Sequence, residues 1–179
     1  MEKGSIFAGV PQITEEKIKR FDFLDIRLSS KDDIRDTALF EFSDKDKVKD
    51  YGFEQSLFMT EGEIDKLEIG EEIYFSGYPL ANEFIGMGMG ITLATCSSII
   101  SSIKYSNRDK KVDFILIDKL VNPGNSGSPV FVGNKILGLA SGTLNQTHRI
   151  GETLINVPVN LGMVRTANYT LDLLEKISK

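Results

Sequence analysis

The sequence has a single histidine, His148, a single cysteine, Cys96, and no tryptophan among its 179 residues. One cysteine cannot form a disulfide within the chain. This favours a cytosolic protein, although a disulfide-free secreted bacterial protein would have the same composition. No cluster of histidine, cysteine and carboxylate residues has the spacing of metal ligands, so we expect no metal and no other cofactor.

Long apolar runs and clustered positive charge are also missing. The apolar stretches are interrupted by charge or glycine well short of a membrane span, and the first twelve residues lack the apolar segment of a signal peptide. The net charge is −5 without a basic patch, which argues against nucleic acid as a partner. We expect a globular protein with no membrane partner and with the cytoplasm favoured, whose oligomeric state the composition leaves open.

Short apolar segments separated by turn residues run along most of the chain. They are rich in Ile, Val, Phe and Thr, and their spacing predicts an all-β sandwich or barrel. The expected strands are Ser5–Val10, Phe21–Leu28, Thr37–Phe42, Glu72–Tyr78, Ile91–Lys104, Val112–Ile117, Pro129–Val132, Ile136–Ser141 and Thr153–Val159. Gly133-Asn134 indicates a hairpin turn. Helices are expected over Thr14–Arg20 and Thr170–Ser178, each capped by its first threonine.

The segment VNPGNSGSPVF, Val121–Phe131, places Ser126 between two glycines. A serine hydroxyl is a weak nucleophile without an adjacent base, and the oxyanion formed by its attack needs fixed hydrogen-bond donors. Backbone N–H groups two residues apart, at Gly124 and Ser126, could supply them. The alternative is an ordinary turn between two strands. The nucleophile elbow of α/β-hydrolases is excluded, because Ser128 replaces its second glycine and a strand, not a helix, is expected to follow.

This segment resembles the active-site segment of trypsin-like (chymotrypsin-fold) serine proteases, Gly-Asp/Asn-Ser-Gly-Gly/Ser-Pro, in a form similar to the bacterial glutamyl endopeptidase and heat-stress proteases. DTALFEF, LEIGEEIYFSGYPL and KILGLASGT resemble, respectively, the strand with the catalytic aspartate, the strand that opens the second barrel, and the strand that lines the substrate cleft. The resemblance implies a double β-barrel whose first barrel is incomplete, with domains over residues 1–62 and 63–165 and a C-terminal helix over 166–179.

The resemblance also implies roles for individual residues. Ser126 would be the nucleophile of peptide-bond hydrolysis, the N–H groups of Gly124 and Ser126 would form the oxyanion hole, and Asp36 would orient the base. Asp25, in LDIRL, is the rival acid. The implied partner is a peptide or protein substrate.

The specificity pocket is implied in the same way. Leu120 would lie at its base with Val121 beside it, and Ala140, Ser141 and Gly142 would line the cleft. None of these side chains carries a charge, so we expect preference for a small or medium apolar side chain of the substrate.

The base of this catalytic group is not evident in the sequence. The family carries its histidine before the aspartate, whereas no histidine precedes Asp36 here. His148 is expected on a surface loop, and the spacing does not support Lys119 or Lys135 as a replacement. Without the base, activity should fall by several powers of ten. Two explanations stay open: a truncated chain that is inactive as printed, or a non-catalytic homologue that binds extended peptides. Three strands are too few to close a six-stranded barrel, which favours truncation.

Overall fold

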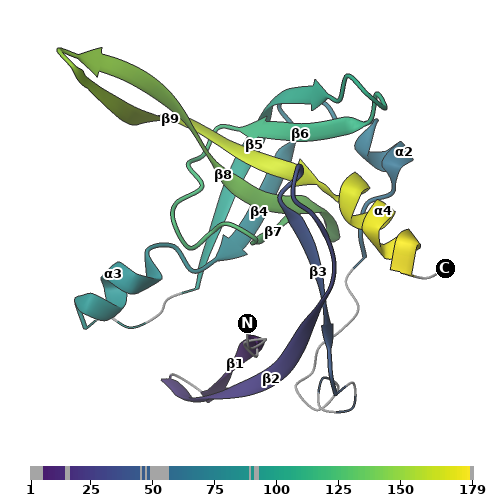
Figure 1. Cartoon of the computed structure of the whole chain (residues 1–179), viewed down its shortest axis with the longest axis vertical. Coiled ribbons are helices and arrows are strands. Elements are labelled where there is room, and N and C mark those ends of the chain that lie inside the picture. The colour runs from purple at the N-terminus through teal and green to yellow at the C-terminus, as the bar shows by residue number, and fades with distance from the viewer. Residues whose placement is uncertain are drawn as a thin grey trace. The chain divides into compact units, whose positions relative to one another are not determined.

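The structure is a computed structural model that describes residues 6–14, 17–44, 46, 48, 57–88, 90 and 93–177. The chain divides into two compact units, each with its own β-sheet (Figure 1). One unit comprises residues 1–55 and 172–179, and the other comprises residues 56–171. The expected all-β architecture with a C-terminal helix is confirmed: the structure has a closed barrel, a second sheet and a final helix.

The sheet of the first unit has three antiparallel strands in the order β1-β2-β3. They are β1 (Ile6–Thr14), β2 (Lys17–Asp32) and β3 (Thr37–Phe42). The helix expected over Thr14–Arg20 is wrong, because Thr14 pairs with Lys17 and Gln12 pairs with Arg20 in the β1–β2 ladder. The threonine and the apolar spacing gave a local helix signal, but pairing with a neighbouring strand outweighs such local preferences.

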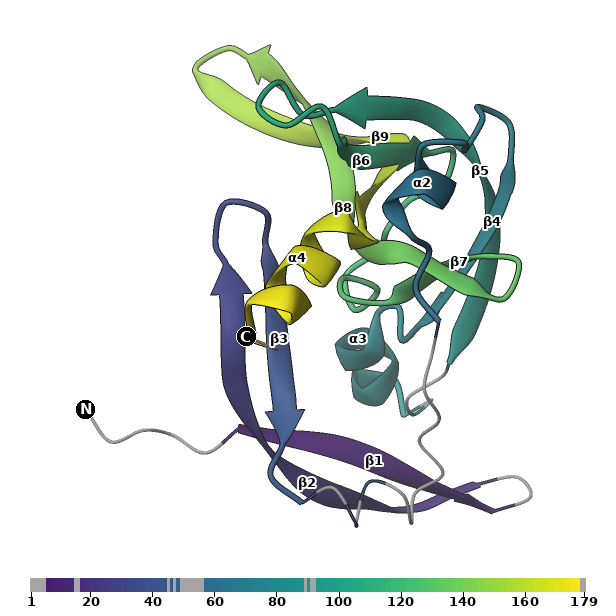
Figure 2. The same cartoon turned by 90° about the vertical axis from the view of Figure 1, so that its right-hand side faces the viewer.

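The second unit is a closed antiparallel barrel with the strand order β4-β5-β6-β9-β8-β7 (Figure 2). Its strands are β4 (Glu72–Gly77), β5 (Ala94–Tyr105), β6 (Val112–Ile117), β7 (Pro129–Val132), β8 (Lys135–Ile150) and β9 (Thr153–Thr166). The β7–β8 hairpin turns at Gly133-Asn134 as expected, with Gly133 at φ +58°. The expected strand start Ile91 lies outside the described residues.

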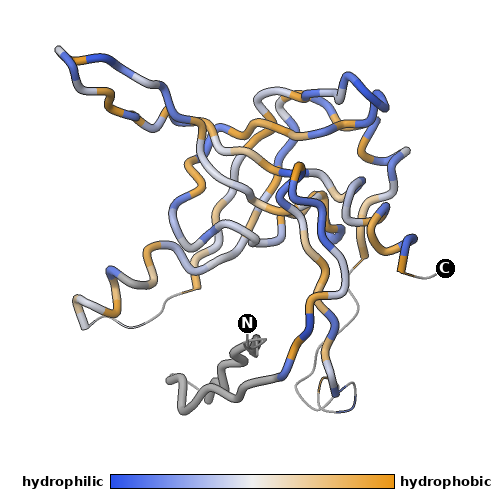
Figure 3. The backbone as a smooth tube through the Cα atoms, viewed as in Figure 1, coloured by the Kyte–Doolittle hydropathy of each residue, from blue (hydrophilic) through white to orange (hydrophobic). Residues whose placement is uncertain are grey.

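Buried and exposed residues alternate along the barrel strands, and this alternation places the apolar side chains in the core. In β4, Ile73 and Phe75 are buried while Glu72 and Tyr74 are exposed, the period of two that a half-buried strand requires. The side chains that fill the barrel are mostly β-branched or aromatic, and Figure 3 shows apolar stretches recurring along its strands. They include Ile73, Phe75, Ile100, Ile115, Ile117, Val130, Leu137 and Val164.

Strands β8 and β9 continue well past the ends expected at Ser141 and Val159. They form a hairpin that projects from the barrel in both views (Figures 1 and 2). The hairpin turns at Gly151, which has φ +63°. Its outer half is exposed on both faces, and the polar residues 145–149 concealed the extension of β8 from sequence reasoning.

Three helices lie entirely within the described residues: α2 (Glu61–Ile64), α3 (Ala81–Gly86) and α4 (Ala167–Ile177). The two short helices were not expected, because each has too few residues to show a helical period. The final helix was expected, but Thr170 is not its cap, since α4 begins three residues earlier and Thr170 is buried within it. No helix in the described part of the chain is long and apolar enough to cross a membrane.

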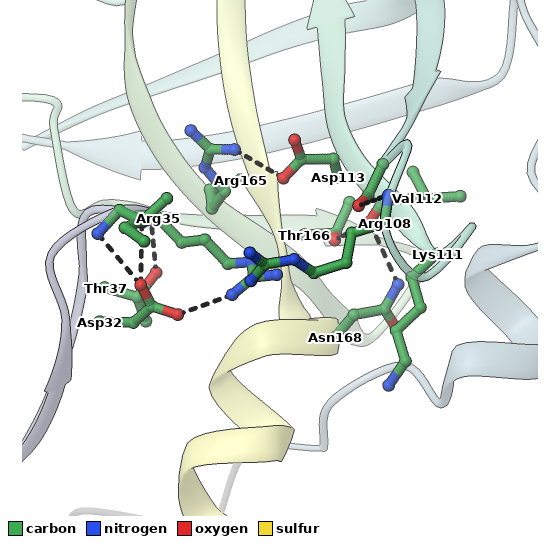
Figure 4. Close-up of polar contacts among 12 residues, drawn as sticks. Asp32, Arg35, Thr37, Arg108, Lys111, Val112, Asp113, Arg165, Thr166 and Asn168 are labelled. Carbon is green, nitrogen blue, oxygen red and sulfur yellow. Dashed lines mark hydrogen bonds and ion pairs between the residues drawn. The ribbon is translucent and has the colours of Figure 1, made fainter.

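Polar contacts join the end of β9 and the start of α4 to strand β6 (Figure 4). The Thr166 hydroxyl donates to the Val112 carbonyl at 2.6 Å, and the Asn168 side-chain amide donates to the same carbonyl at 3.2 Å. Arg165 donates to the Asp113 carboxylate at 2.8 Å. These contacts fix the direction in which the chain leaves the barrel.

Candidate functional site

The serine segment forms the loop between β6 and β7, and both of its ends are tied to strand β8. At the start, the Val121 N–H donates to the Thr143 hydroxyl oxygen at 2.9 Å, and the Thr143 hydroxyl donates to the Val121 carbonyl at 3.0 Å. At the end, the Gly127 N–H donates to the Ala140 carbonyl at 2.7 Å, and the Ala140 N–H donates to the Ser128 carbonyl at 2.9 Å. The residues between therefore arch from one fixed point on β8 to another.

Glycine is required at two positions of this arch. Gly124 has φ +91° and Gly127 has φ +84°, a region that other residues rarely adopt. A Cβ atom on Gly124 would also lie 2.2 Å from the Tyr78 carbonyl oxygen. The Leu80 N–H donates to the neighbouring Pro123 carbonyl at 2.8 Å, which holds the arch against the segment after β4.

The side chains on either side of Ser126 are buried under the arch. Asn125 and Ser128 are 2% and 8% exposed. Both pack on Gly77 at the end of β4: a Cβ atom there would lie 2.1 Å from Ser128 Oγ and 2.7 Å from Asn125 Oδ1. Sequence reasoning missed this support, although Gly77 stands in the GYP segment that the resemblance had singled out. The glycine leaves room for the two side chains that anchor the loop.

Ser126 itself is exposed at the top of the arch. Its hydroxyl donates to the Ser141 carbonyl of β8 at 3.0 Å. Within the part of the chain that the structure describes, neither the Gly124 N–H nor the Ser126 N–H donates a hydrogen bond. The arrangement thus combines an exposed hydroxyl with two nearby backbone donors that are free to bind an oxygen atom.

The residues expected to form a specificity pocket differ in whether their side chains are accessible to a ligand. The side chains of Val121 and Ala140 are 5% and 1% exposed and belong to the barrel core, so only their backbones can face a ligand. Leu120, Ser141 and Gly142 are half-buried. A Cβ atom on Gly142 would meet nothing within 4 Å, so the space beside this residue is open.

Asp36 lies in the turn that precedes β3. It is exposed and has φ +49°, a conformation that aspartate tolerates better than most residues. The turn is stabilised by Asp32, whose carboxylate accepts from the Arg35 guanidinium at 2.9 Å and from the Arg35 backbone N–H at 3.1 Å (Figure 4). These hydrogen bonds hold the pKa of Asp32 below its usual value. The rival Asp25 lies in β2 and accepts from the Ser43 hydroxyl at 3.1 Å.

The three alternative bases lie elsewhere on the barrel unit. His148 is exposed on β8 in the projecting hairpin, where it pairs with Ile155 of β9. The loop expected there is therefore wrong, although the surface position is as expected. Lys119 is exposed before the serine loop. Lys135 donates to Glu63 at 2.5 Å and lowers the pKa of that carboxyl to about 2.

No grouping of ligating side chains that could hold a metal ion is present among the residues that the structure describes. The features that can act on a ligand are therefore an exposed hydroxyl, free backbone donors and an uncharged edge of β8. Such a set can hold the carbonyl oxygen of a ligand beside the hydroxyl.

No family profile matches the chain, but the known proteins that resemble it are Do-like and HtrA-type proteins. The Do-like 13 protein of Arabidopsis thaliana is 36% identical over 117 residues, which cover 60% of this chain and 23% of that protein. The serine protease Do-like HtrA of Lactococcus lactis is 24% identical over 147 residues, covering 82% of this chain and 33% of that protein. The chain thus spans about a quarter to a third of the length of these relatives.

Among solved structures, an HtrA-type protease, AlgW, described with a decapeptide, matches with a TM-score of 0.59 and 18% identity. The match covers 90% of this chain and 42% of the protease chain. At this identity the likeness concerns the fold, which agrees with the barrel, the second sheet and the final helix described above.

Proposed function

We propose that this chain, whose homologues are the Do-like and HtrA serine proteases of the trypsin-like fold, supplies the nucleophile of a serine endopeptidase. The observation that carries the proposal is the exposed Ser126 hydroxyl on a glycine-bent arch, beside the free N–H groups of Gly124 and Ser126. An acyl-transfer site requires this combination of nucleophile and preorganised donors.

The reaction would follow the acyl-enzyme course. The Ser126 oxygen attacks the peptide carbonyl carbon, its proton passes to a base, and the carbonyl oxygen becomes an oxyanion held by the two N–H groups. The C–N bond then breaks as the base returns the proton to the leaving amine. Water attacks the remaining ester in the same manner and releases the acid, which restores the Ser126 hydroxyl.

The Ser126 hydroxyl also needs a proton acceptor. Within the described residues, the Ser126 hydroxyl bonds to the Ser141 carbonyl, which accepts a hydrogen bond but cannot take up a proton. Asp36 is our candidate for the acid that orients the base. His148 is left outside the proposal because it lies on the projecting hairpin of β8 and β9.

The proposed substrate is an extended peptide with an uncharged side chain next to the scissile bond. From Ser141 onward β8 has no strand beside it on its β7 side among the described residues, since the last pair between the two strands joins Pro129 and Leu139. An extended peptide can add to such an edge through main-chain hydrogen bonds. Leu120 and Gly142 add no charge that would attract an acidic or basic side chain.

Peptide binding without cleavage is the second candidate. The same hydrogen bond from Ser126 to Ser141 favours it, because the hydroxyl is engaged by a group that cannot activate it. In that case the free edge of β8 would hold the peptide and Ser126 would have no chemical role.

A serine-directed fluorophosphonate separates the two candidates. For the hydrolase we expect one covalent adduct on the peptide that contains Ser126, located by mass spectrometry, and its loss in Ser126→Ala. Because the hydroxyl bonds to a carbonyl and not to a base, the reaction should be slow, but still faster than at other exposed serines. Ser141→Ala is the matched control and should keep the label, since only the backbone of Ser141 takes part. Labelling no faster at Ser126 than at other exposed serines would contradict the hydrolase proposal, and peptide affinity without labelling would favour the binding module.

A further inference from the structure

We infer that Ser126 is held in a resting state by a carbonyl of its own chain, and that an arriving peptide releases it by competing for that carbonyl. The acceptor is the backbone carbonyl of Ser141 on β8, to which the Ser126 hydroxyl donates at 3.0 Å. The inference rests on the proposed function, because it concerns how a peptide that adds to β8 changes the nucleophile. It makes the main chain of the peptide, rather than a side chain, the signal for release.

The Ser141 carbonyl is available because β8 is irregular at this residue. Ala140 pairs with Val164 of β9 and Gly142 pairs with Met163, so Ser141 is an extra residue without a partner in the β8–β9 ladder. In a regular antiparallel strand, the backbone groups of successive residues point to opposite sides. Both backbone groups of Ala140 bond to the serine loop, so a regular strand would direct the Ser141 carbonyl toward β9. The β-bulge turns it toward the loop instead.

The hydrogen bond to Ser141 keeps the nucleophile from reacting. The single proton of the Ser126 hydroxyl points at an oxygen that accepts hydrogen bonds but cannot take up a proton. General-base catalysis requires this proton to lie within hydrogen-bond reach of the base. No base can therefore receive the proton until the hydroxyl leaves the Ser141 carbonyl.

An extended peptide competes for the same carbonyl. The last residue pair between β7 and β8 joins Pro129 and Leu139, and the serine loop occupies Ala140, so Ser141 offers the first acceptor on the free edge of β8. A strand that adds to this edge satisfies such acceptors with its main-chain N–H groups. The Ser126 hydroxyl reaches the carbonyl from the same side of β8. One hydrogen bond to the carbonyl thus replaces another, and the exchange is nearly balanced in energy.

The release needs no rearrangement of the loop. The Gly127 N–H donates to the Ala140 carbonyl at 2.7 Å, a backbone contact in which the Ser126 hydroxyl takes no part. Within the described residues, the N–H groups of Gly124 and Ser126 donate no hydrogen bond in the resting state either. Rotation of one exposed side chain is therefore sufficient to free the hydroxyl for a base.

The test is a cycle of equilibrium affinities, so it does not depend on turnover. N-acetyl-Ala-Ala-Ala-Ala with a free carboxylate is compared with a form whose last alanine is replaced by lactic acid, which exchanges one N–H for an ester oxygen and keeps the shape. Both are titrated into the ¹⁵N-labelled wild-type chain and Ser126→Ala, with the amide shifts of Gly124 and Gly142 as reporters. Loss of the hydroxyl should tighten binding of the amide peptide by about fivefold and that of the ester peptide by less than about twofold.

A matched variant and a measurement without peptide serve as controls. Ser97→Ala also removes an exposed serine hydroxyl, on β5, and should leave both affinities unchanged. The resting contact is checked in the free chain: the carbonyl ¹³C shift of Ser141 should move in Ser126→Ala and stay in place in Ser97→Ala. Ser126 is exposed, so its truncation should not unfold the chain.

Several results would overturn the inference. An equal gain for both peptides would mean that the hydroxyl obstructs the peptide instead of competing for the carbonyl. Weaker binding of the amide peptide to Ser126→Ala would mean that the hydroxyl bonds to the peptide directly. An unmoved Ser141 carbonyl shift would remove the resting contact, and the absence of peptide-induced shifts at Gly124 and Gly142 would remove the peptide from this edge. If the cycle shows the coupling but Ser126 fails to label with a fluorophosphonate, only the proposed hydrolase fails.

Discussion

A methyl group added at Gly77 should disturb the serine loop from below. The Cβ atom of Gly77→Ala would lie 2.1 Å from Ser128 Oγ and 2.7 Å from Asn125 Oδ1, both in buried side chains. Neither side chain can rotate into solvent, so the strand or the loop must move. Overpacking of this kind lowers the free energy of unfolding by about 1–3 kcal/mol. Because the displaced side chains flank Ser126, we also expect fluorophosphonate labelling to slow.

The double variant Gly77→Ala, Ser128→Ala tests whether overlap with the Ser128 hydroxyl causes the destabilisation. It removes the closest of the two overlapping atoms, so urea denaturation followed by circular dichroism should show a favourable coupling of about 1 kcal/mol between the two changes. Gly62→Ala is the matched control, since its Cβ atom would meet nothing within 4 Å. Additive effects of the two changes would refute the packing argument. Unchanged labelling in a destabilised Gly77→Ala would show that the loop tolerates the displacement.

Two further predictions concern backbone strain and charge. Gly124→Ala combines a φ of +91° with a Cβ atom 2.2 Å from the Tyr78 carbonyl, and it should slow Ser126 labelling by about a hundredfold, measured by intact mass over time. The pKa of Glu63 is lowered from 4.5 to about 2, first by the hydrogen bond from Lys135. Its contribution to stability is therefore present above pH 4.5 and lost as the pH falls toward 2. Lys135→Met should raise that pKa, as read from the side-chain carboxyl ¹³C shift, and an unchanged pKa would contradict the assignment.

The barrel strands could be predicted from sequence because their apolar residues recur with the period of two that a half-buried strand requires. Val112–Ile117 and Pro129–Val132 of the barrel have the expected bounds, as does Thr37–Phe42 in the sheet of the first unit. Prediction failed where the signal is not local. The outer part of β8, residues 145–149, is polar, and its pairing with β9 makes it a strand. Thr14 and Lys17–Arg20 are extended because β1 pairs with β2.

The serine loop shows the same contrast between local signals and contacts with residues distant in the sequence. Gly124 and Gly127 could be read from the sequence, since a bent backbone around a serine calls for glycine. Thr143 and Gly77 could not, because each acts on a loop residue distant in the sequence, Thr143 on Val121 and Gly77 on Ser128. Roles of this kind depend on which strands become neighbours. The signal that could have pointed to Gly77 was its place in the GYP segment.

Among the described residues, the contacts that fix the position of Ser126 lie within the barrel unit. The contacts that fix the Ser126 loop come from Thr143 and Ala140 of β8 and from Gly77 and Leu80 at the end of β4, all within residues 56–171. Asp36 belongs to the other unit. Replacing it with asparagine should therefore leave the serine loop and its hydrogen bonds unchanged. If Asp36 orients the base, the variant should alter the pH profile of Ser126 labelling, because only proton transfer would be affected. An unchanged profile would remove Asp36 from the proposed mechanism and leave Asp25 as the acid to test.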